Sequence, residues 1–305
     1  MRDPDMAKLA AQHKGALARY LVQGDQWPRS EGHYHAEVEL ESIERAMMEL
    51  PPGVPPGLVT ADEVRAKATP EGLLELNTLW QPERGRMREA YPGIPEAEWA
   101  DKIRAKKADE AQNRGLVKHT LDQNGFGSCA SEGIAGCTMF CEEKQGFPAE
   151  PLNAFALYRY VNGGRDGGSS LSDNITAAAR YGIPSERVWP RSNGWRTRLS
   201  DEAKRDALRH RPDEVYRVSN RVEFGTALLM GFVVYAGYSG HAWFAVDLID
   251  TTRFYWKNSW GADWGDNGVG TLRFAELQWG YGCWAVRTAR MASEVPDALA
   301  LEAAA

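Results

Sequence analysis

The sequence predicts an α+β protein, with helices in the first two thirds of the chain and strands in the last third. Helical spacing of apolar residues and helix-capping patterns recur before residue 182. From Val215 onward, β-branched and aromatic residues dominate and several segments alternate with period two, which is typical of antiparallel strands. Helices and strands that are segregated along the chain favour the α+β class over an alternating α/β fold.

The length and charge of the chain exclude several classes of protein. Its 305 residues exceed one common domain length of ~150 residues. A formal net charge of −6 indicates no binding to nucleic acid or to an anionic membrane. The longest apolar run, over residues 227–236, is too short for a membrane span of about 20 residues. Residues 1–21 lack the apolar stretch of a secretion signal, so we expect a cytoplasmic protein.

Residues 1–93 are expected to form a helical N-terminal extension. Apolar residues recur at helical spacing over residues 6–21 and again over 35–50. Residues 51–57 then carry four prolines and two glycines, which exclude a helix interior and a central strand. This segment is predicted to be a stiff, extended connector.

Two helix starts follow the connector. Thr60 and Glu63 match a capping box, in which the threonine side chain accepts from a helical N–H and the glutamate reaches back to the cap residue. Thr69 precedes Pro70, and proline is favoured at the first helical position because its missing N–H has no helical partner there. A further helix is predicted over residues 94–112.

Residues 94–290 are predicted to form the folded core. Within it we expect a helical lobe over about 115–212 and a β-rich lobe over about 213–290. Residues 291–305 form an alanine-rich C-terminal tail without a helix stop signal.

The helical lobe is predicted to contain two helices separated by a glycine-rich loop. The first helix covers residues 129–145 and the loop covers 163–170. Arg165 and Asp166 of this loop either face solvent or contact substrate. The second helix, over 172–181, ends at a glycine, which is favoured just after a last helical residue.

The β-rich lobe is predicted to contain short strands of an antiparallel sheet or barrel. Each candidate is rich in β-branched and aromatic residues, and several alternate with period two. The candidates are residues 215–218, 232–238, 241–249, 253–260, 269–274 and 283–289.

Four polar residues indicate nucleophilic catalysis. Cys129 stands at a loop-to-helix junction, where the helix dipole favours a thiolate. His241 lies on a predicted strand between two small residues and can take the thiol proton. Asn258 on the next strand can orient the imidazole, and the amide of Gln123 can share an oxyanion with the backbone N–H of Cys129.

In this order, the four residues and their flanking motifs resemble the papain-like cysteine peptidases over roughly residues 93–290. The most specific match is Asn-Ser-Trp-Gly at 258–261 with Trp-Gly at 264–265 and Gly268. The resemblance implies a two-lobed fold, in which a helical lobe faces an antiparallel, β-barrel-like lobe across a substrate cleft.

The resemblance also implies the roles of the site residues. Cys129 is the nucleophile that forms a thioester acyl-enzyme, and His241 is the general base and acid. Asn258 orients His241, and Gln123 is the oxyanion donor. The resemblance also implies residues of the substrate site. Trp260 shields the His–Asn pair, and Gly167 and Gly168 bind the substrate backbone. A side-chain pocket is lined by Ser170, Ala242 and Thr288.

Several positions depart from the family pattern. Phe126 and Arg165 stand where the family has the two ends of one disulfide, and Cys283 lacks the loop that would hold its partner. These losses favour a reducing compartment. Ala130 replaces a tryptophan after the nucleophile. Glu132 lies in a helical turn that is normally apolar, and the sequence offers no explanation for it.

No metal ion or other cofactor is expected. Cys137 and Cys141 are interpreted as small apolar residues on the inner face of a helix. His33 and His35 lack a second pair of ligands that would complete a metal site.

The role of residues 1–93 stays open between three possibilities. The first is a propeptide, since a helical extension in this family often blocks the cleft. The helical signature of such propeptides fails here: Glu41 and Arg45 fit its first two positions, but Glu49 stands in place of an aromatic residue. The second is a docking module for a protein partner, and the third is an integral part of the fold. As a propeptide, the extension would have a natural processing site at residues 112–115.

We expect hydrolysis of peptide bonds in polypeptide substrates. Gly240 stands where some relatives carry an acid, so apolar side chains are expected to be preferred over basic ones. One alternative is an acyl- or peptidyl-transferase with the same triad. Another is an interaction protein associated with a larger bacterial or viral assembly, although the presence of all four residue types argues against a loss of catalysis.

Overall fold

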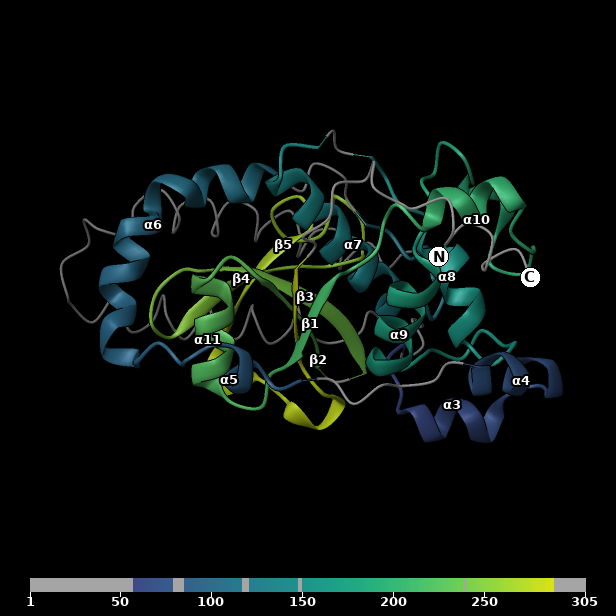
Figure 1. The fold of residues 1–305 in the computed structure, drawn as a ribbon, viewed down its shortest axis with the longest axis horizontal. Helices are drawn as coiled ribbons and strands as arrows, with labels where there is room; N and C mark the ends of the chain where they lie inside the picture. Colours follow the sequence, from purple (N-terminus) through teal and green to yellow (C-terminus); the bar gives the residue numbers. More distant parts are fainter. Residues whose placement is uncertain (1–56, 79–84, 117–120, 148–149, 239, 288–305) are drawn as a thin grey trace.

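The structure, a computed structural model, describes residues 57–78, 85–116, 121–147, 150–238 and 240–287. The helices predicted before Gly57, most of the proline-rich connector and the C-terminal tail lie outside these residues. The described part contains helices and one antiparallel sheet, which confirms the α+β class (Figure 1). No helix in this part is long and apolar enough to cross a membrane.

The sheet occupies the centre of the molecule, and each predicted strand segment overlaps one of its strands (Figure 1). The strands are β1 (Glu214–Arg217), β2 (Val233–Tyr238), β3 (His241–Leu248), β4 (Arg253–Lys257), β5 (Val269–Arg273) and β6 (Trp284–Arg287). Their order across the sheet is β1-β6-β2-β3-β4-β5, with each neighbouring pair antiparallel. The two short 3-10 helices η2 (Phe274–Glu276) and η3 (Trp279–Tyr281) lie between β5 and β6 along the chain.

The helical lobe is built around the helix that begins at Cys129. Its elements are α7 (Cys129–Lys144), α8 (Ala154–Val161), α9 (Leu171–Tyr181), the 3-10 helix η1 (Arg191–Asn193) and α10 (Asp201–Ala207). Asn153 and Ser170 cap α8 and α9, since their side chains accept from backbone N–H groups of the first turn. Gly182 ends α9 with a φ of 71°, a conformation that glycine adopts without strain. The predicted bounds of α7 and α9 agree with the structure within about one residue.

Three helices pack on the other side of the sheet, namely α5 (Met87–Ala90), α6 (Glu96–Leu116) and α11 (Arg221–Leu229). Trp99 of α6 is fully buried against Gly225 of α11. A Cβ at Gly225 would lie 2.2 Å from the indole ring, so only glycine allows this close approach. Figure 1 shows α5, α6 and α11 together at the end of the molecule away from α9.

The sheet separates these two groups of helices, and the residues of its strands alternate between them. Val233 and Tyr235 of β2 belong to the apolar core that contains α7. Val234 and Ala236 belong to the core that contains α6 and α11. Because both faces are covered, β3 is buried along its whole length, beginning with His241.

The two helices predicted after the proline-rich connector are α3 (Ala61–Lys67) and α4 (Pro70–Thr78). The predicted capping box is present, because Glu63 N–H donates to Thr60 Oγ1 at 3.3 Å and Thr60 N–H donates to Glu63 Oε2 at 2.7 Å. Thr69 Oγ1 accepts from Gly72 N–H in the first turn of α4. Both helices lie beside the helical lobe (Figure 1).

The described part of the N-terminal extension shares its apolar contacts with the rest of the chain. Val64 and Leu76 belong to the core of the helical lobe, whereas Met87 belongs to the core on the other side of the sheet. Residues 112–115, the predicted processing site, lie within α6. The boundary at residue 93 stays a prediction.

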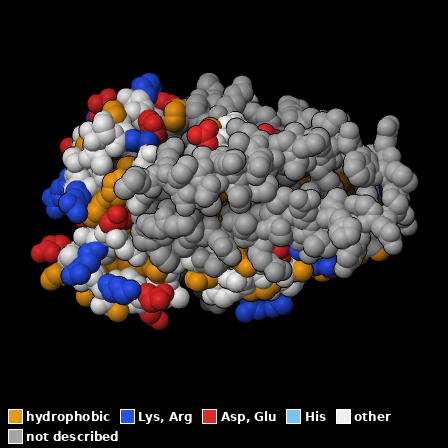
Figure 2. All heavy atoms as spheres, turned by 180° about the vertical axis from the view of Figure 1, so that it is seen from behind, with side chains coloured by type: hydrophobic (Ala, Val, Ile, Leu, Met, Phe, Trp, Pro, Cys, Tyr) orange, Lys and Arg blue, Asp and Glu red, His pale blue; other side chains and the backbone are white. Residues whose placement is uncertain are grey.

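Charged side chains of both signs are interspersed over the described surface at the end of the molecule where α3, α4 and α10 lie (Figure 2). This mixture on the described surface agrees with the net charge of −6 and offers no single-sign field there.

Candidate active site

Cys129 is the first residue of α7, where the unpaired N–H groups of a helix favour a negative charge. Its side chain is fully buried. The backbone N–H of Ala242 donates to Sγ of Cys129 over 3.4 Å. Since Ala242 follows His241 on β3, this contact brings the first turn of α7 to the start of that strand.

His241 and Asn258 form a hydrogen-bonded pair. Nε2 of His241 and Oδ1 of Asn258 lie 2.5 Å apart. The backbone N–H of Ser259 donates to the same Oδ1 at 2.7 Å, which supports this orientation of the amide. With Oδ1 as acceptor, Nε2 carries the proton and Nδ1 keeps a lone pair. Nδ1 is buried and has no hydrogen-bond partner among the described residues, so it is available to accept a proton.

Trp260 lies against this pair. The centroids of its ring and the imidazole of His241 are 4.5 Å apart. Trp264 packs edge-on against Trp260, with ring centroids 5.9 Å apart. The indole of Trp260 therefore covers one side of the imidazole.

Burial favours the neutral form of both the Cys129 thiol and the His241 imidazole. It raises the pKa of Cys129 to about 12 and lowers the pKa of His241 to about 4. The hydrogen bond from His241 to Asn258 acts in the opposite direction but is the smaller effect. Both side chains are buried, Cys129 fully and His241 nearly so.

Gln123 is held in place by Ser259, the neighbour of Asn258. Its backbone N–H donates to the carbonyl oxygen of Ser259 at 2.9 Å, and its Oε1 accepts from the Ser259 hydroxyl at 2.9 Å. Nε2 donates to the carbonyl oxygen of Phe126 at 2.7 Å. An amide nitrogen has two N–H groups, so one remains for another acceptor.

The residues predicted to bind substrate have different surroundings. Ala242 lies at the sulfur, as described above. Gly168 N–H donates to the hydroxyl of Tyr158, and Ser170 caps α9, so both support the loop beside the site. Gly167 is exposed. Thr288 lies outside the described residues.

The start of the described chain lies directly over Cys129. A Cβ at Gly57 would be 2.7 Å from Sγ of Cys129. The next residue, Leu58, is only 2% exposed, and its Cδ2 would be 2.1 Å from a Cβ at Gly237. The backbone of the N-terminal extension therefore covers the sulfur, and a leucine side chain packs beside it.

Backbone hydrogen bonds hold this covering strand, residues 57–59, on both sides. Ser169 N–H donates to Gly57 O at 2.9 Å, and Val59 N–H donates to Ser169 O at 3.3 Å, in a parallel bridge. Leu58 N–H donates to Gly240 O at 2.8 Å. Ser169, the residue after the glycine pair at 167–168, makes these contacts, and the binding of substrate backbone by that pair stays a prediction.

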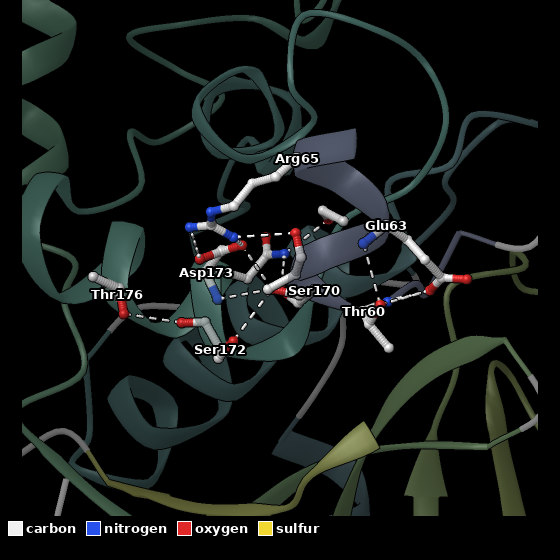
Figure 3. A network of polar contacts seen from close by, with 10 residues as sticks. Thr60, Glu63, Arg65, Ser170, Ser172, Asp173 and Thr176 are labelled. Atoms are coloured by element: carbon white, nitrogen blue, oxygen red, sulfur yellow. Dashed lines mark hydrogen bonds and ion pairs between the residues drawn. The ribbon is translucent and has the colours of Figure 1, made fainter. Parts of the chain in front are cut away.

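After the covering strand, α3 is fastened to α9 by a network of polar contacts (Figure 3). The guanidinium of Arg65 donates to both oxygens of Asp173, at 3.0 and 3.2 Å. Asp173 is fully buried and also accepts from the Ser170 hydroxyl at 2.8 Å. A second ion pair joins Glu75 of α4 to Arg159 of α8 at 2.8 Å.

The turn between α3 and α4 packs on the glycine-rich loop. A Cβ at Gly164 would lie 2.3 Å from Oγ1 of Thr69, and a Cβ at Gly72 would lie 2.1 Å from the carbonyl carbon of Gly163. Two backbones therefore meet without side chains between them. Gly163 and Gly164 of this loop allow the close packing of the extension, a role that the sequence did not indicate.

Asp166 joins the glycine-rich loop to the segment before the nucleophile. Its Oδ1 accepts from Gly127 N–H at 2.8 Å and from the Tyr158 hydroxyl at 2.9 Å. Tyr158 in turn accepts from Gly168 N–H at 3.1 Å. Asp166 thus makes structural contacts, where the sequence left the choice between solvent and substrate open.

The three remaining cysteines are interpreted as structural residues or, for Cys283, as the remnant of a family disulfide. Cys137, Cys141 and Cys283 are buried thiols that form no disulfide among the described residues. Burial raises the pKa of Cys137 and of Cys283 well above that of an ordinary thiol. Within the described part of the chain, no group of histidine, cysteine or carboxylate side chains is arranged to hold a metal ion.

Comparisons with known proteins give similarities of fold at low identity. Xylellain, a cysteine protease from Xylella fastidiosa, is 21% identical with a TM-score of 0.49, covering 56% of this chain and 83% of that one. The Amb a 11 cysteine protease of ragweed pollen, in its proform, is 16% identical with a TM-score of 0.49, covering 95% and 88%. Procathepsin L 3 of Tenebrio molitor larval midgut is 14% identical with a TM-score of 0.47, covering 89% and 97%.

No protein-family model matches the chain, and no curated protein sequence matches it. Similarity at this level concerns the arrangement of helices and strands and assigns no activity to the chain.

Proposed function

We propose that the protein is a cysteine peptidase whose nucleophile is Cys129. One observation carries the proposal. The N–H of Ala242 donates to Sγ of Cys129, and the residue before Ala242 is His241, whose Nε2 is hydrogen-bonded to Asn258. A thiol at a helix N-terminus, beside an imidazole whose tautomer is fixed by an amide, is the arrangement that nucleophilic catalysis by cysteine requires.

In the proposed reaction Cys129, His241 and Gln123 act on the substrate, while Asn258 holds the imidazole of His241 through Nε2. His241 Nδ1 takes the thiol proton, and Sγ attacks the carbonyl carbon of the peptide bond. The negative charge on the carbonyl oxygen is stabilised by Cys129 N–H and by the second N–H of Gln123 Nε2. His241 then gives its proton to the leaving amine, and the C–N bond breaks. Water hydrolyses the resulting thioester by the reverse sequence of proton transfers.

The covering strand holds this peptidase in a closed state. Gly57 occupies the space over Sγ that a substrate carbonyl would need. Its own carbonyl oxygen accepts from Ser169 N–H, so this peptide bond is held by Ser169 rather than by the oxyanion donors. The strand is therefore an internal block and not a bound substrate, which corresponds to a propeptide-like role for the extension.

Opening the strand would also activate the thiol. Burial is the largest cause of the raised pKa of Cys129 and of the lowered pKa of His241. Access of water to the sulfur and the imidazole reduces this cost of ionisation, so the pKa of Cys129 falls and that of His241 rises. Both changes favour transfer of the proton from sulfur to imidazole.

The contacts of the covering strand also indicate the substrate class. They are backbone hydrogen bonds to Ser169 and Gly240 together with the packing of Leu58 on Gly237. We expect an extended polypeptide to use the same groups once the strand has moved, with an apolar side chain in the place of Leu58. This expectation agrees with the apolar preference predicted from Gly240.

The test uses the full chain with Leu58→Glu, called the opened chain below. A carboxylate in the place of a buried leucine disfavours docking of the strand. The opened chain should hydrolyse an unfolded protein substrate, and the same chain with Cys129→Ala should not. Equal cleavage by both would exclude Cys129 as the nucleophile.

Product analysis separates hydrolysis from acyl transfer. With an added amine, a hydrolase releases free carboxyl termini, whereas a transferase passes most of the acyl group to the amine. A folded opened chain that neither cleaves nor transfers would instead support an interaction protein that has kept a peptidase fold.

A further inference from the structure

Glu132 is a fully buried carboxylate one helical turn after the nucleophile. Burial raises its pKa, which the positive charge of Arg191 opposes. Buried carboxylates are rare unless they are paired. The residue therefore calls for a reason beyond packing, since an apolar side chain would fill the same turn at a lower energetic cost.

Arg191 supplies the partner of Glu132 from η1. Its Nη2 donates to Glu132 Oε1 at 2.6 Å and its Nη1 donates to Oε2 at 3.2 Å, so the pair is bidentate. The guanidinium also lies over the ring of Phe155, 4.2 Å from the centroid. Only 21% of the Arg191 side chain is exposed. Such a fork-to-fork pair fixes both position and orientation.

The same guanidinium reaches the loop segment that carries the proposed oxyanion donor. Nη2 of Arg191 donates to the carbonyl oxygen of Asp122 at 2.7 Å. Asp122 immediately precedes Gln123 and bridges to Trp260 in an antiparallel pair. One side chain therefore connects the helix of the nucleophile, through Glu132, with the segment of Gln123.

From this juxtaposition we propose that Arg191 and Glu132 are a positioning pair for the catalytic site. Arg191 sets the distance between the first turn of α7 and the oxyanion donor Gln123, and its charge cancels that of Glu132 beside Cys129. The proposal rests on the proposed peptidase activity and adds two residues that touch neither substrate nor the reacting atoms.

The charged groups around Arg191 and Glu132 determine how a substitution of either residue would change the pKa of Cys129. Glu186 lies 3.6 Å from Arg191 Nη1. The groups that face Cys129 or the pair are Glu132 on α7, Tyr158 on α8, Tyr235 on β2, and Asp122 and Glu186 in loops. His241 on β3 immediately precedes Ala242, whose N–H donates to the sulfur. The charge of Glu132 contributes to the raised pKa of Cys129, after the larger effect of burial. Without Arg191, ionised Glu132 would oppose the thiolate more strongly.

The experiment measures two quantities in the opened chain: the pH dependence of iodoacetamide labelling at Cys129, and kcat and KM for a peptide substrate. Arg191→Met should move the labelling profile to higher pH and lower kcat on the order of tenfold or more, because the oxyanion donor is misplaced. Glu132→Gln should move the profile to lower pH.

The double variant Glu132→Gln/Arg191→Met separates the two roles. Removing both charges should return the labelling profile to that of the opened chain, while kcat stays low because the Asp122 carbonyl has lost its donor. Arg191→Lys keeps the charge but not the fork, so it should keep the profile and lower kcat. This milder variant provides the test if Arg191→Met does not fold.

The matched control is Arg187→Met, which breaks an exposed arginine–glutamate pair with Glu150 in the same segment. It should change neither quantity. If Arg191→Met leaves the labelling profile unchanged and lowers kcat only in proportion to the folded fraction, the pair is merely structural and the proposal is wrong. If the opened chain itself is neither labelled at Cys129 nor active, the proposed function fails first, and the two failures are distinguishable.

Discussion

Gly57 lies so close to Cys129 that a single methyl group at Gly57 would stand 2.7 Å from the sulfur. Real Cβ atoms do not approach other atoms this closely, so the covering strand has its present position only because residue 57 has no side chain. The glycine at the end of the proline-rich connector is therefore what allows the covering strand to block the proposed nucleophile.

Gly57→Ala should weaken the closed state. The added methyl group must push the strand away from Sγ, and overpacking of this kind costs about 1–3 kcal/mol. We expect the rate of thiol labelling at Cys129 to rise about tenfold, since 1.36 kcal/mol corresponds to one factor of ten. Gly280→Ala is the matched control, because a Cβ there meets nothing within 4 Å. A normal labelling rate in Gly57→Ala would argue against the close contact.

Arg65→Ala should release α3 from α9. The substitution takes a guanidinium away from the buried carboxylate of Asp173, and loss of one partner of a buried ion pair is costly. With part of Arg65 exposed, we expect about 2 kcal/mol, or about thirtyfold faster labelling at Cys129. Arg104→Ala breaks an exposed pair with Asp101 and should leave the rate unchanged.

The pH dependence of stability should report the buried imidazole. The pKa of His241 in the folded chain is lowered from 6.5 to about 4, so below pH 6.5 the unfolded chain binds more protons than the folded one. The free energy of unfolding should therefore be highest above pH 6.5 and fall by up to about 3 kcal/mol as the pH drops through 4.

Urea unfolding at several pH values measures this slope, and His241→Gln should flatten it. Comparison of the two chains isolates His241 from the other groups that titrate in this range, such as His210, which is paired with Glu142. An equal slope in both chains would contradict the buried, neutral imidazole.

Tyr158→Phe tests the link between the glycine-rich loop and the segment before Cys129. It removes a hydroxyl that donates to Asp166 and accepts from Gly168 N–H. Loss of these two hydrogen bonds destabilises the present arrangement of the loop by about 1–3 kcal/mol. In the opened chain, kcat/KM should fall about tenfold with little change in the amount of folded protein. Tyr160→Phe, whose ring stacks on Tyr181, is the control with the same chemical change.

The sequence predicted the features that depend on local pattern. Period two located the strands, and the caps at Thr60 and Thr69 indicated two helix starts because the capping atoms are three residues from their partners. The order of Gln123, Cys129 and the later histidine and asparagine predicted the candidate site through a family resemblance.

Contacts between distant segments were not predictable in the same way. Gly57 and Ser169 are 112 residues apart, and their pairing depends on where the connector crosses the folded lobes. The pairing of Glu132 with Arg191, 59 residues apart, has no signature either, because charged residues are common and only burial distinguishes this pair. Both features need the tertiary fold to bring their segments together.

The most direct test of the account is to map the site of covalent labelling by an epoxide-type thiol inhibitor, in the full-length chain and in the chain with Leu58→Glu. Intact mass gives the rate, and peptide mapping gives the labelled residue. The buried thiols of Cys137, Cys141 and Cys283 serve as internal controls.

We expect slow labelling of the unmodified chain, at least tenfold faster labelling of Leu58→Glu on the scale of a ~1.4 kcal/mol change, and Cys129 as the labelled residue in both. Labelling at Cys137 in place of Cys129, or equal rates in the two chains, would contradict the claim that the covering strand closes the site of a nucleophilic Cys129.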